Sequence, residues 1–410
     1  MNSKVASREF LPAKPSGVLI WLVQHLSMLD LAWRNKVHMS ADDVKVLQNL
    51  PGVHGLILTP NHADELDPRI CFEVSRKVAQ QFMFMCNREA FHELRGFAGW
   101  VLQRIGAYSV ERGGHDLAAK QYSIDIVKKS KNTLVIFPEG EIFYLNQLLQ
   151  PFHSGAIEIG MQAIIDRRVS EPNWTTFLIP MSIRYHYVAS IKKELEKRIK
   201  RMEAHLEKHY SGATAQSRLT GIMNDAITEK ELRHHVAPET EHLGEVAGRV
   251  EYLRTALIAQ VGKKYKGSYK EQARTIDQAF QLSAHLREQL SQTVSQQHQS
   301  EYKEDLSTLQ EVQHLVAWHP DYVKENPSPE RIAEMVIKLE RELLNIHRPE
   351  PLGKREVFIK IGKPLDLSTY LERYKTEPYV VRSEVAELLR SEIQLLIDVD
   401  LKAPLVSESL

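Results

Sequence analysis

The sequence has few cysteines, no surplus of charge and no long apolar run, and each absence excludes a class of protein. Its two cysteines, Cys71 and Cys86, fit neither a disulfide framework nor a zinc site, which indicates buried thiols in a reducing compartment. The 53 basic and 53 acidic residues cancel, so nucleic acid is not expected as a main partner. With 43% apolar residues, the 410-residue chain can form two or three domains, or one enlarged by an insertion.

No stretch reaches the roughly 18 uninterrupted apolar residues of a membrane span. The N-terminus also lacks the basic start, apolar run and cleavage site of a secretory signal. The nearest approach to a span is residues 17–34, an apolar helix pattern with two tryptophans that Gln24, His25 and Asp30 interrupt. Such a helix can lie in the headgroup region of a bilayer or pack on the protein core, and its pattern alone leaves both roles open.

Strand and helix patterns alternate from residue 55 onward. The predicted strands are 55–59, 82–86, 106–110, 133–137 and 176–184, and the predicted helices are 67–80, 90–104, 115–130 and 154–166. This alternation predicts an α/β fold with a mostly parallel central sheet flanked by helices. Before it, residues 1–15 carry two prolines and mixed polarity, which predicts a flexible start.

The second half of the chain has a different character. Residues 188–353 carry long charged helix patterns and predict a large all-helical insertion, in which His234 and His235 are expected at the surface. A strand near 357–365 and an amphipathic helix at 383–399 then resume the first pattern. The predicted domains are therefore 1–187 with 354–400, the insertion 188–353, and a flexible tail at 401–410.

His62 is the first candidate for chemistry. It lies just past the predicted strand 55–59, and Asp67 follows five residues later at the start of a helix with Pro68 in its first turn. A carboxylate on one imidazole nitrogen fixes the tautomer and raises the basicity of the other nitrogen, so the pair can take a proton from a hydroxyl. By itself the pair is also compatible with a solvated histidine and a helix-capping aspartate. In a loop at a strand end, His62 should be replaceable without loss of core packing.

Three further blocks follow this pair in order. They are Gly106–Arg112, Phe137–Glu141 and Ile179–Ile183. With Asn61–Asp67, they resemble the motifs of the glycerolipid acyltransferase family, of the 1-acylglycerol-3-phosphate acyltransferase type. The resemblance covers about residues 15–185, resumes near 354–400, and does not account for the helical insertion.

The resemblance implies a reaction and a set of site residues. His62 would be the general base that deprotonates an acceptor hydroxyl, and Asp67 would orient and stabilise the imidazole. The hydroxyl would attack an acyl thioester carried by coenzyme A or acyl carrier protein, with no other cofactor and no metal implied. The implied substrate-binding residues are Arg112, Glu139, Gly140 and Pro180, of which Arg112 and the 137–140 loop would hold the acceptor's phosphate.

The resemblance also implies partners and a location. A lipid acceptor and an acyl donor would be the substrates, in phospholipid biosynthesis. The enzyme would be cytoplasmic and peripherally bound to a membrane surface, which favours the interfacial role for residues 17–34.

Three departures from the family motifs lower the positive charge near the acceptor. Asp64 and Glu65 stand inside the first motif, Glu141 follows the Phe-Pro-Glu-Gly block, and His153 replaces a usual lysine. A non-phosphorylated acceptor is therefore one alternative, and a catalytically silent scaffold that works through its helical insertion is another. A third is a metal-dependent hydrolase with the ligands His62, Asp64, Asp67 and His153.

Overall fold

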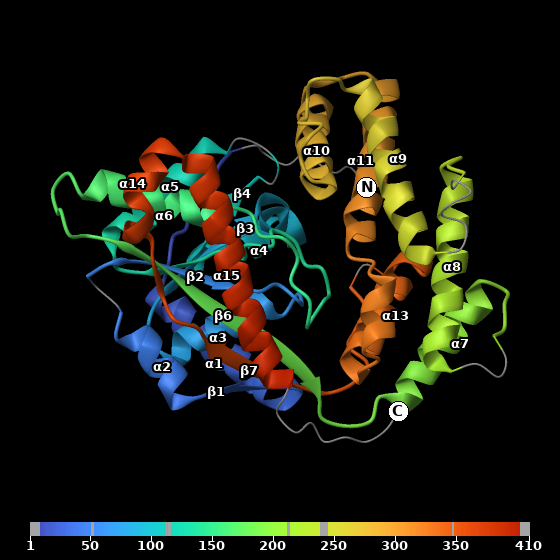
Figure 1. Cartoon of the computed structure of the whole chain (residues 1–410), viewed down its shortest axis with the longest axis horizontal. Coiled ribbons are helices and arrows are strands. Elements are labelled where there is room, and N and C mark those ends of the chain that lie inside the picture. The colour runs from blue at the N-terminus through green and yellow to red at the C-terminus, as the bar shows by residue number, and fades with distance from the viewer. Residues whose placement is uncertain are drawn as a thin grey trace. The chain divides into compact units, whose positions relative to one another are not determined.

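The computed structural model describes residues 9–50, 53–111, 113, 116–210, 214–237, 245–346 and 348–401 (Figure 1). Contacts divide the chain into two units. The first, the sheet unit, runs to Val110, resumes from Asp116 to His186 and returns at Arg355. The second, the helical unit, is Tyr187–Lys354 with the short stretch around Gly113. The predicted tail, apart from its first residue, lies outside the described residues.

The sheet unit is an α/β fold around a mostly parallel eight-stranded sheet, which confirms the predicted fold class. The strand order is β1-β7-β6-β2-β5-β3-β4, and the short β8 pairs antiparallel with β6. The strands are β1 Asn35–Met39, β2 Gly55–Pro60, β3 Phe82–Asn87, β4 Ala107–Val110, β5 Thr133–Val135, β6 Thr176–Tyr187, β7 Arg355–Ile361 and β8 Leu365–Asp366.

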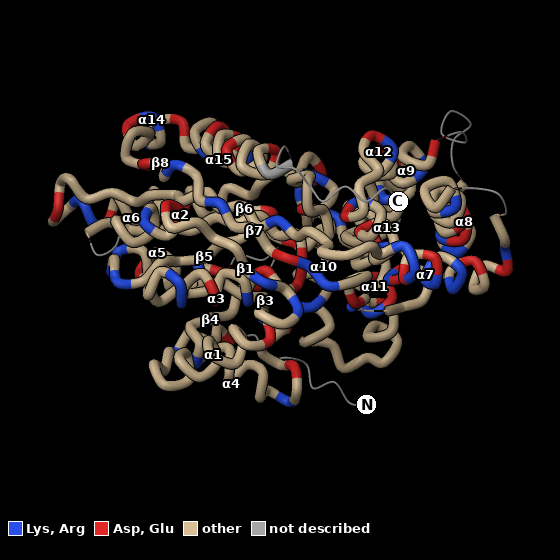
Figure 2. Tube along the Cα trace, turned by 90° about the horizontal axis from the view of Figure 1, so that it is seen from below, with Lys and Arg blue, Asp and Glu red and all other residues tan. Residues whose placement is uncertain are grey.

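Helices cover both faces of this sheet. Residues of α5, α6 and α15 belong to one buried apolar cluster, and residues of α1, α2 and α3 belong to the other. Figure 2 shows α15 on one side of the strands and α1 and α4 on the other. The helices are α1 Gly17–Arg34, α2 Ala41–Gln48, α3 Asp67–Lys77, η1 Arg88–Gly96, α4 Phe97–Arg104, α5 Leu117–Lys129, α6 Gly155–Arg167, η3 Leu367–Tyr370, α14 Leu371–Thr376 and α15 Pro378–Leu401.

The predicted helix 90–104 is wrong in its middle. Leu94 and Arg95 have φ values of 50° and 58°, and Gly96 has a φ of 90°. A glycine adopts positive φ without steric cost, so the chain turns there, and η1 ends where α4 begins. The pair β1 and α2 was not predicted, although Ser40 caps α2 by accepting the N–H of Asp43 at 3.1 Å, a local signal that the sequence does carry.

The flexible start is also wrong for its described part. The N–H of Ser109 in β4 donates to the carbonyl of Leu11 at 3.0 Å, and the N–H of Leu11 donates to the Ser109 hydroxyl at 2.8 Å. Phe10 packs on the rings of Tyr108 and Tyr122. The segment is therefore held against β4 by long-range contacts, which the composition of the segment does not indicate.

In the helical unit, the described residues of 188–354 form helices and no strand. These are α7 Lys192–His205, α8 Ala215–Arg233, α9 Val246–Lys264, α10 Thr275–Gln292, α11 Gln296–Val316, α12 Pro320–Glu325 and α13 Pro329–Leu343. The two ends of the segment meet, because the N–H of Val188 donates to the carbonyl of Lys354 at 3.1 Å. We call this closed base of the insertion the neck.

A buried ionic group ties three of these helices together. Lys230 of α8 contacts Glu311 of α11 at 2.6 Å and Glu342 of α13 at 2.9 Å, and 5% of its side chain is exposed. His234 contacts Glu311 at 2.8 Å and its side chain is 15% exposed, so it is only partly at the surface, whereas His235 is exposed as predicted. Burial raises the pKa of Glu311, but the His234 hydrogen bond and the Lys230 charge outweigh it and lower that pKa to about 2.

Candidate active site

The candidate site lies where three neighbouring strands end. β2 lies between β5 and β6 and runs parallel to both. The carboxyl ends of these strands therefore meet at one edge of the sheet, which is where ligands bind in parallel α/β sheets. His62 follows β2, and Glu139 follows β5. Beyond β2, the side chain of Asn61 accepts the N–H of Ile183 at 2.7 Å and donates to its carbonyl at 3.1 Å, so the loop carrying His62 is anchored to β6.

The structure brings His62 and Asp67 together. Nδ1 of His62 lies 2.9 Å from Oδ2 of Asp67, and the two side chains are 8% and 0% exposed. Asp67 is the first residue of α3 and also accepts the N–H of Asp64 at 2.8 Å. With Nδ1 turned to the carboxylate, Nε2 is the nitrogen that can exchange a proton with a substrate. Burial raises the pKa of Asp67, and the hydrogen bond and charge of His62 act against that rise.

His62 is more deeply packed than its loop position suggests. Its ring stacks on Phe137 with the ring centroids 4.1 Å apart, and 6% of the residue is exposed. The expectation that His62 carries no core packing is therefore wrong. Phe137 comes from the segment after β5, 75 positions further along the chain, so local sequence does not show this cover.

Glu139 joins two loops of the site through its carboxylate. Oε1 accepts the backbone N–H of His62 at 2.7 Å, and Oε2 accepts the N–H of Gln150 at 3.1 Å. The side chain is buried, and this burial raises the pKa of Glu139 to about 8, although the two N–H bonds act in the opposite direction. Gly140 follows with a φ of +76°, and a Cβ there would meet the ring of His153 at 2.6 Å. Glu139 thus joins the His62 loop to the loop around Gln150, and the next residue, Gly140, lies against His153.

Pro180 and Arg112 complete the predicted set. Pro180 is a buried residue within β6, opposite Thr59 of β2, and its ring packs toward Gly362. Arg112 lies outside the described residues. The geometry therefore brings together His62, Asp67, Glu139 and Gly140, and places Pro180 inside the sheet that supports them.

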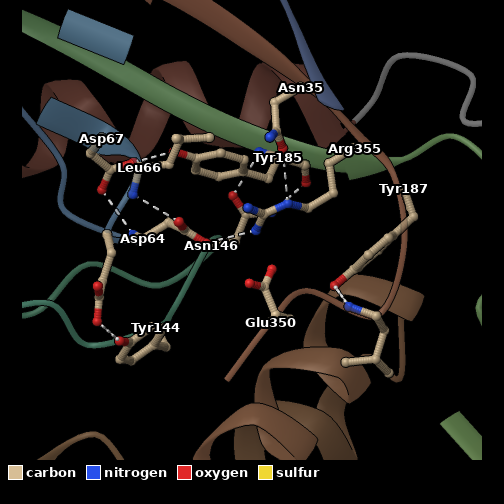
Figure 3. A network of polar contacts seen from close by, with 12 residues as sticks. Asn35, Asp64, Leu66, Asp67, Tyr144, Asn146, Tyr185, Tyr187, Glu350 and Arg355 are labelled. Carbon is tan, nitrogen blue, oxygen red and sulfur yellow. Dashed lines mark hydrogen bonds and ion pairs between the residues drawn. The ribbon is translucent and has the colours of Figure 1, made fainter. Parts of the chain in front are cut away.

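Sequence reasoning missed three residues that hold this site (Figure 3). The hydroxyl of Tyr185 in β6 donates to Oδ1 of Asp67 at 2.5 Å. Arg355 of β7 donates to Oδ2 of Asp64 at 2.7 Å, and its guanidinium lies 4.4 Å from the centre of the Tyr185 ring. Asn146 accepts the Tyr185 N–H and donates to its carbonyl. No local spacing links these residues, because Arg355 is 291 positions from Asp64.

These contacts bear on the metal-dependent hydrolase. Asp64 binds Arg355 and accepts the N–H of Leu66 at 2.9 Å, while Asp67 accepts from Tyr185 and the Asp64 backbone and contacts His62. Both carboxylates that this alternative needs are thus taken up by protein donors. Over the described ranges, no group of three or more His, Cys, Asp or Glu side chains is placed to hold a metal ion.

The raised pKa of Glu139 predicts a pH-dependent stability. The pKa of Glu139 is near 4.5 in the unfolded chain and about 8 in the folded state, so the folded state holds the carboxyl proton more tightly. The stability that this difference contributes is complete below pH 4.5 and is lost as the pH rises toward 8. Glu139→Gln removes the titration. We therefore expect the unfolding free energy of the variant, relative to wild type, to increase between these pH values by up to about 1.4 kcal/mol per pH unit.

Urea denaturation at several pH values measures this difference. Glu171→Gln, at an exposed residue outside the site, is the control and should give a difference that does not depend on pH. A flat profile for Glu139→Gln as well would show that Glu139 does not titrate in this range.

Comparison with known proteins finds a match over the segment that carries most of this site. Residues 43–184 match the family model described as Acyltransferase, and this segment contains β2, β5 and the loops of the site. The sheet unit therefore contains a segment that matches an acyltransferase domain and is similar to the glycerolipid acyltransferases.

A particular relative is the 1-acyl-sn-glycerol-3-phosphate acyltransferase of Streptococcus pneumoniae (strain ATCC BAA-255 / R6). It is 34% identical to this chain over 61 residues, which is 15% of this chain and 22% of the relative. The matched segment thus spans about a fifth of the length of that protein.

Proposed function

We propose that this protein is an acyltransferase of phospholipid biosynthesis. It moves a fatty acyl group from a thioester of coenzyme A or acyl carrier protein to a hydroxyl of a glycerophosphate or lysophospholipid-like acceptor. The observation that carries this proposal is the buried His62–Asp67 pair at the carboxyl edge of the sheet, within the segment that matches the family model. The name of the pneumococcal relative supports the acceptor class.

The chemistry follows from the pair. Nε2 of His62 takes the proton of the acceptor hydroxyl as its oxygen attacks the thioester carbonyl, and Asp67 stabilises the imidazolium that forms. The C–S bond then breaks, and the departing thiolate receives the proton from His62. A thioester is already activated, so a base and close positioning of the two substrates are what the protein has to supply.

An acceptor panel tests this function. Radiolabelled acyl-CoA and acyl-carrier-protein thioesters are each offered with glycerol 3-phosphate, a lysophosphatidate, and neutral or amine-bearing lipids. We expect transfer to a phosphorylated glycerol acceptor. Transfer only to the other acceptors would replace the acceptor class, and no transfer to any would favour the silent scaffold. Thioester hydrolysis that a chelator abolishes would favour the hydrolase instead.

Arg112 provides a test of the phosphate itself. As the basic residue that the chain keeps from the family's phosphate motif, it should pair with the acceptor's phosphate. Such a charge-assisted bond is worth about 1.5–3 kcal/mol, so Arg112→Ala should raise the acceptor KM by about 10- to 150-fold. Steady-state kinetics measures this change. Thioester hydrolysis by water is the internal control and should hardly change, while an unchanged acceptor KM would indicate a neutral acceptor.

We further propose that α1 and α4 attach the protein to a membrane surface. Both helices lie on the same side of the sheet (Figure 2), and the N–H of Ser16 before α1 donates to the carbonyl of Arg104 in α4 at 2.9 Å. Both also carry exposed apolar side chains. The exposed residues are Val18, Trp21, Leu22, Leu26, Leu29 and Trp33 of α1, and Phe97 and Trp100 of α4. Leu31 of α1 is buried, so the helix has one face on the core and one apolar face in solvent, as an interfacial helix does. Among the helices described, none is both long and apolar enough to cross a bilayer.

Flotation with liposomes tests this attachment. Trp21 and Leu22 are 59% and 42% exposed, so replacing both with serine should disturb little packing. We expect wild type to float with liposomes and the double variant to remain in the soluble fraction. Val169→Ser, at a residue that is 89% exposed outside α1 and α4, is the control and should float like wild type. Unchanged flotation of the double variant would contradict the role of α1.

A further inference from the structure

The Asp67 carboxylate accepts hydrogen bonds from other donors besides His62. It is fully buried, and it contacts His62 Nδ1 through Oδ2 at 2.9 Å while Oδ1 accepts the Tyr185 hydroxyl at 2.5 Å. The Asp64 backbone N–H adds a third bond to Oδ2 at 2.8 Å. A buried carboxylate stays ionised only where donors compensate for its lost hydration. The Tyr185 hydroxyl is the side-chain donor to Oδ1, the carboxylate oxygen that does not contact His62.

Tyr185 is itself held on two sides. Asn146 accepts its backbone N–H at 2.9 Å and donates to its carbonyl at 2.7 Å, which fixes the strand at this position. Arg355 lies over its ring at 4.4 Å and is in turn bound to Asp64 (Figure 3). The hydroxyl therefore points at Asp67 without needing to reorder, and it belongs to a network built from β6, β7 and the loops after β2 and β5.

We propose that Tyr185 is a positioning residue that sets the proton affinity of the His62–Asp67 pair. This role deepens the proposed acyltransferase function and rests on it for its catalytic meaning. The phenol withdraws negative charge from Asp67, so the ionised carboxylate holds the imidazole ring while attracting the proton less strongly. Without this donor the pair binds a proton more tightly, whether the proton lies on the ring or on the carboxylate.

Other charged or titratable groups surround the pair and remain in the test protein. Asp64 and Glu139 lie on the loops, Cys71 on α3 and Arg355 on β7. Asp64 acts electrostatically on Asp67 and Arg355 acts on Tyr185, while the charge of Asp67 acts on Glu139 and Cys71. Of these, Asp64 raises the pKa of Asp67, while the Tyr185 hydrogen bond lowers it. A substitution limited to the phenol oxygen leaves all four groups in place, so its effect can be assigned to the hydroxyl.

Tyr185→Phe tests the proposal through a pH profile. The acidic limb of kcat/KM for acyl transfer should move to higher pH by about one unit, because a hydrogen bond to a charged group is worth roughly that much proton affinity. Tyr108→Phe is the matched control, since Tyr108 is also fully buried in the sheet unit but its hydroxyl contacts Ser123 on α5 at 2.6 Å. The control should leave the limb in place. A limb that does not move in Tyr185→Phe, or that moves equally in both variants, overturns the proposal.

A measurement that needs no substrate separates this proposal from the function. In protein labelled with 13C-histidine, His62→Gln identifies the His62 ring signal, and its titration midpoint should rise by about one unit in Tyr185→Phe. A raised midpoint without acyl transfer to any acceptor would keep the pairing and reject the acyltransferase. An unchanged midpoint would reject the role of Tyr185 while leaving the acyltransferase standing. Incorporation of fluorotyrosine at 185, a stronger donor, should move the midpoint the opposite way, and a midpoint that rises there would also overturn the proposal.

Discussion

Replacement of His62 by glutamine should lower kcat for acyl transfer by about two to four orders of magnitude, the usual loss when a general base is removed. Glutamine is the informative substitution because the ring packs on Phe137 and its Nδ1 contacts buried Asp67. Alanine would open a cavity and remove the carboxylate's partner, whereas glutamine keeps much of the volume and an N–H donor. Initial-rate kinetics with the acceptor found in the panel measures the loss.

The chain offers a matched control at His38. This histidine also stacks on a phenylalanine, Phe358, and is paired with a carboxylate, Glu356, at 3.2 Å. It lies in β1 of the same unit and outside the candidate site. His38→Gln should therefore retain wild-type turnover, and both variants should unfold cooperatively in urea. Turnover of a folded His62→Gln protein within a few-fold of wild type would exclude His62 as the base.

The second large effect concerns stability. Lys230→Met should lower the unfolding free energy of the helical unit by about 3–5 kcal/mol, because it removes the ammonium from two buried carboxylates that keep only their histidine partners and, for Glu342, Arg341. Here Glu311 and Glu342 would both lose the ammonium that lies between them. Methionine keeps the length of the apolar stem, so the loss reports the charge rather than the volume. Urea denaturation followed by far-UV circular dichroism measures it.

The pH dependence of the unfolding free energy provides a second test of this prediction. The pKa of Glu311 is lowered on folding, so its stabilisation is present above the unfolded value near 4.5 and is lost as pH falls toward 2. Lys230→Met removes one cause of that lowering and should flatten the acid dependence. Lys197→Met is the control, because the Lys197 side chain is 75% exposed and its pair with Glu194 is expected to contribute less than about 1 kcal/mol. Equal losses of unfolding free energy in both variants would show that the buried contacts of Lys230 contribute no more stability than an exposed ion pair.

The parts of the fold that sequence predicted are the parts with a local signature. Strands and helices of the sheet unit follow from apolar periods, and the His62–Asp67 pair lies within five residues, where a turn can be anticipated. The break at Leu94 and Arg95 was missed because neither residue favours positive φ, and only Gly96 signals it.

The supporting network had no such signature. Tyr185 lies 118 positions from Asp67, and Lys230 lies 81 and 112 positions from its two carboxylate partners. In a single sequence, a tyrosine in a strand or a lysine on a helix has the same pattern whether or not it meets a distant acid. Polar contacts of this kind are decided by the packing of elements, which local spacing does not encode.

The neck joins two strands, β6 and β7, that are separated in the sequence by the whole insertion, and this affects the order in which the site can form during synthesis. β7, which brings Arg355 to the site, leaves the ribosome only after the whole segment that Val188 and Lys354 close. A nascent chain can pair β2 with β5 and β6 early, but β1 has no β7 beside it until Arg355 joins Asn35 across 320 positions. Because domains begin folding as they emerge, the growing chain carries an unpaired β6 edge and an incomplete candidate site until about its last fifty residues appear. The helical insertion lies between His62 and Arg355 in the sequence, so His62 is synthesised well before the strand that supports its loop.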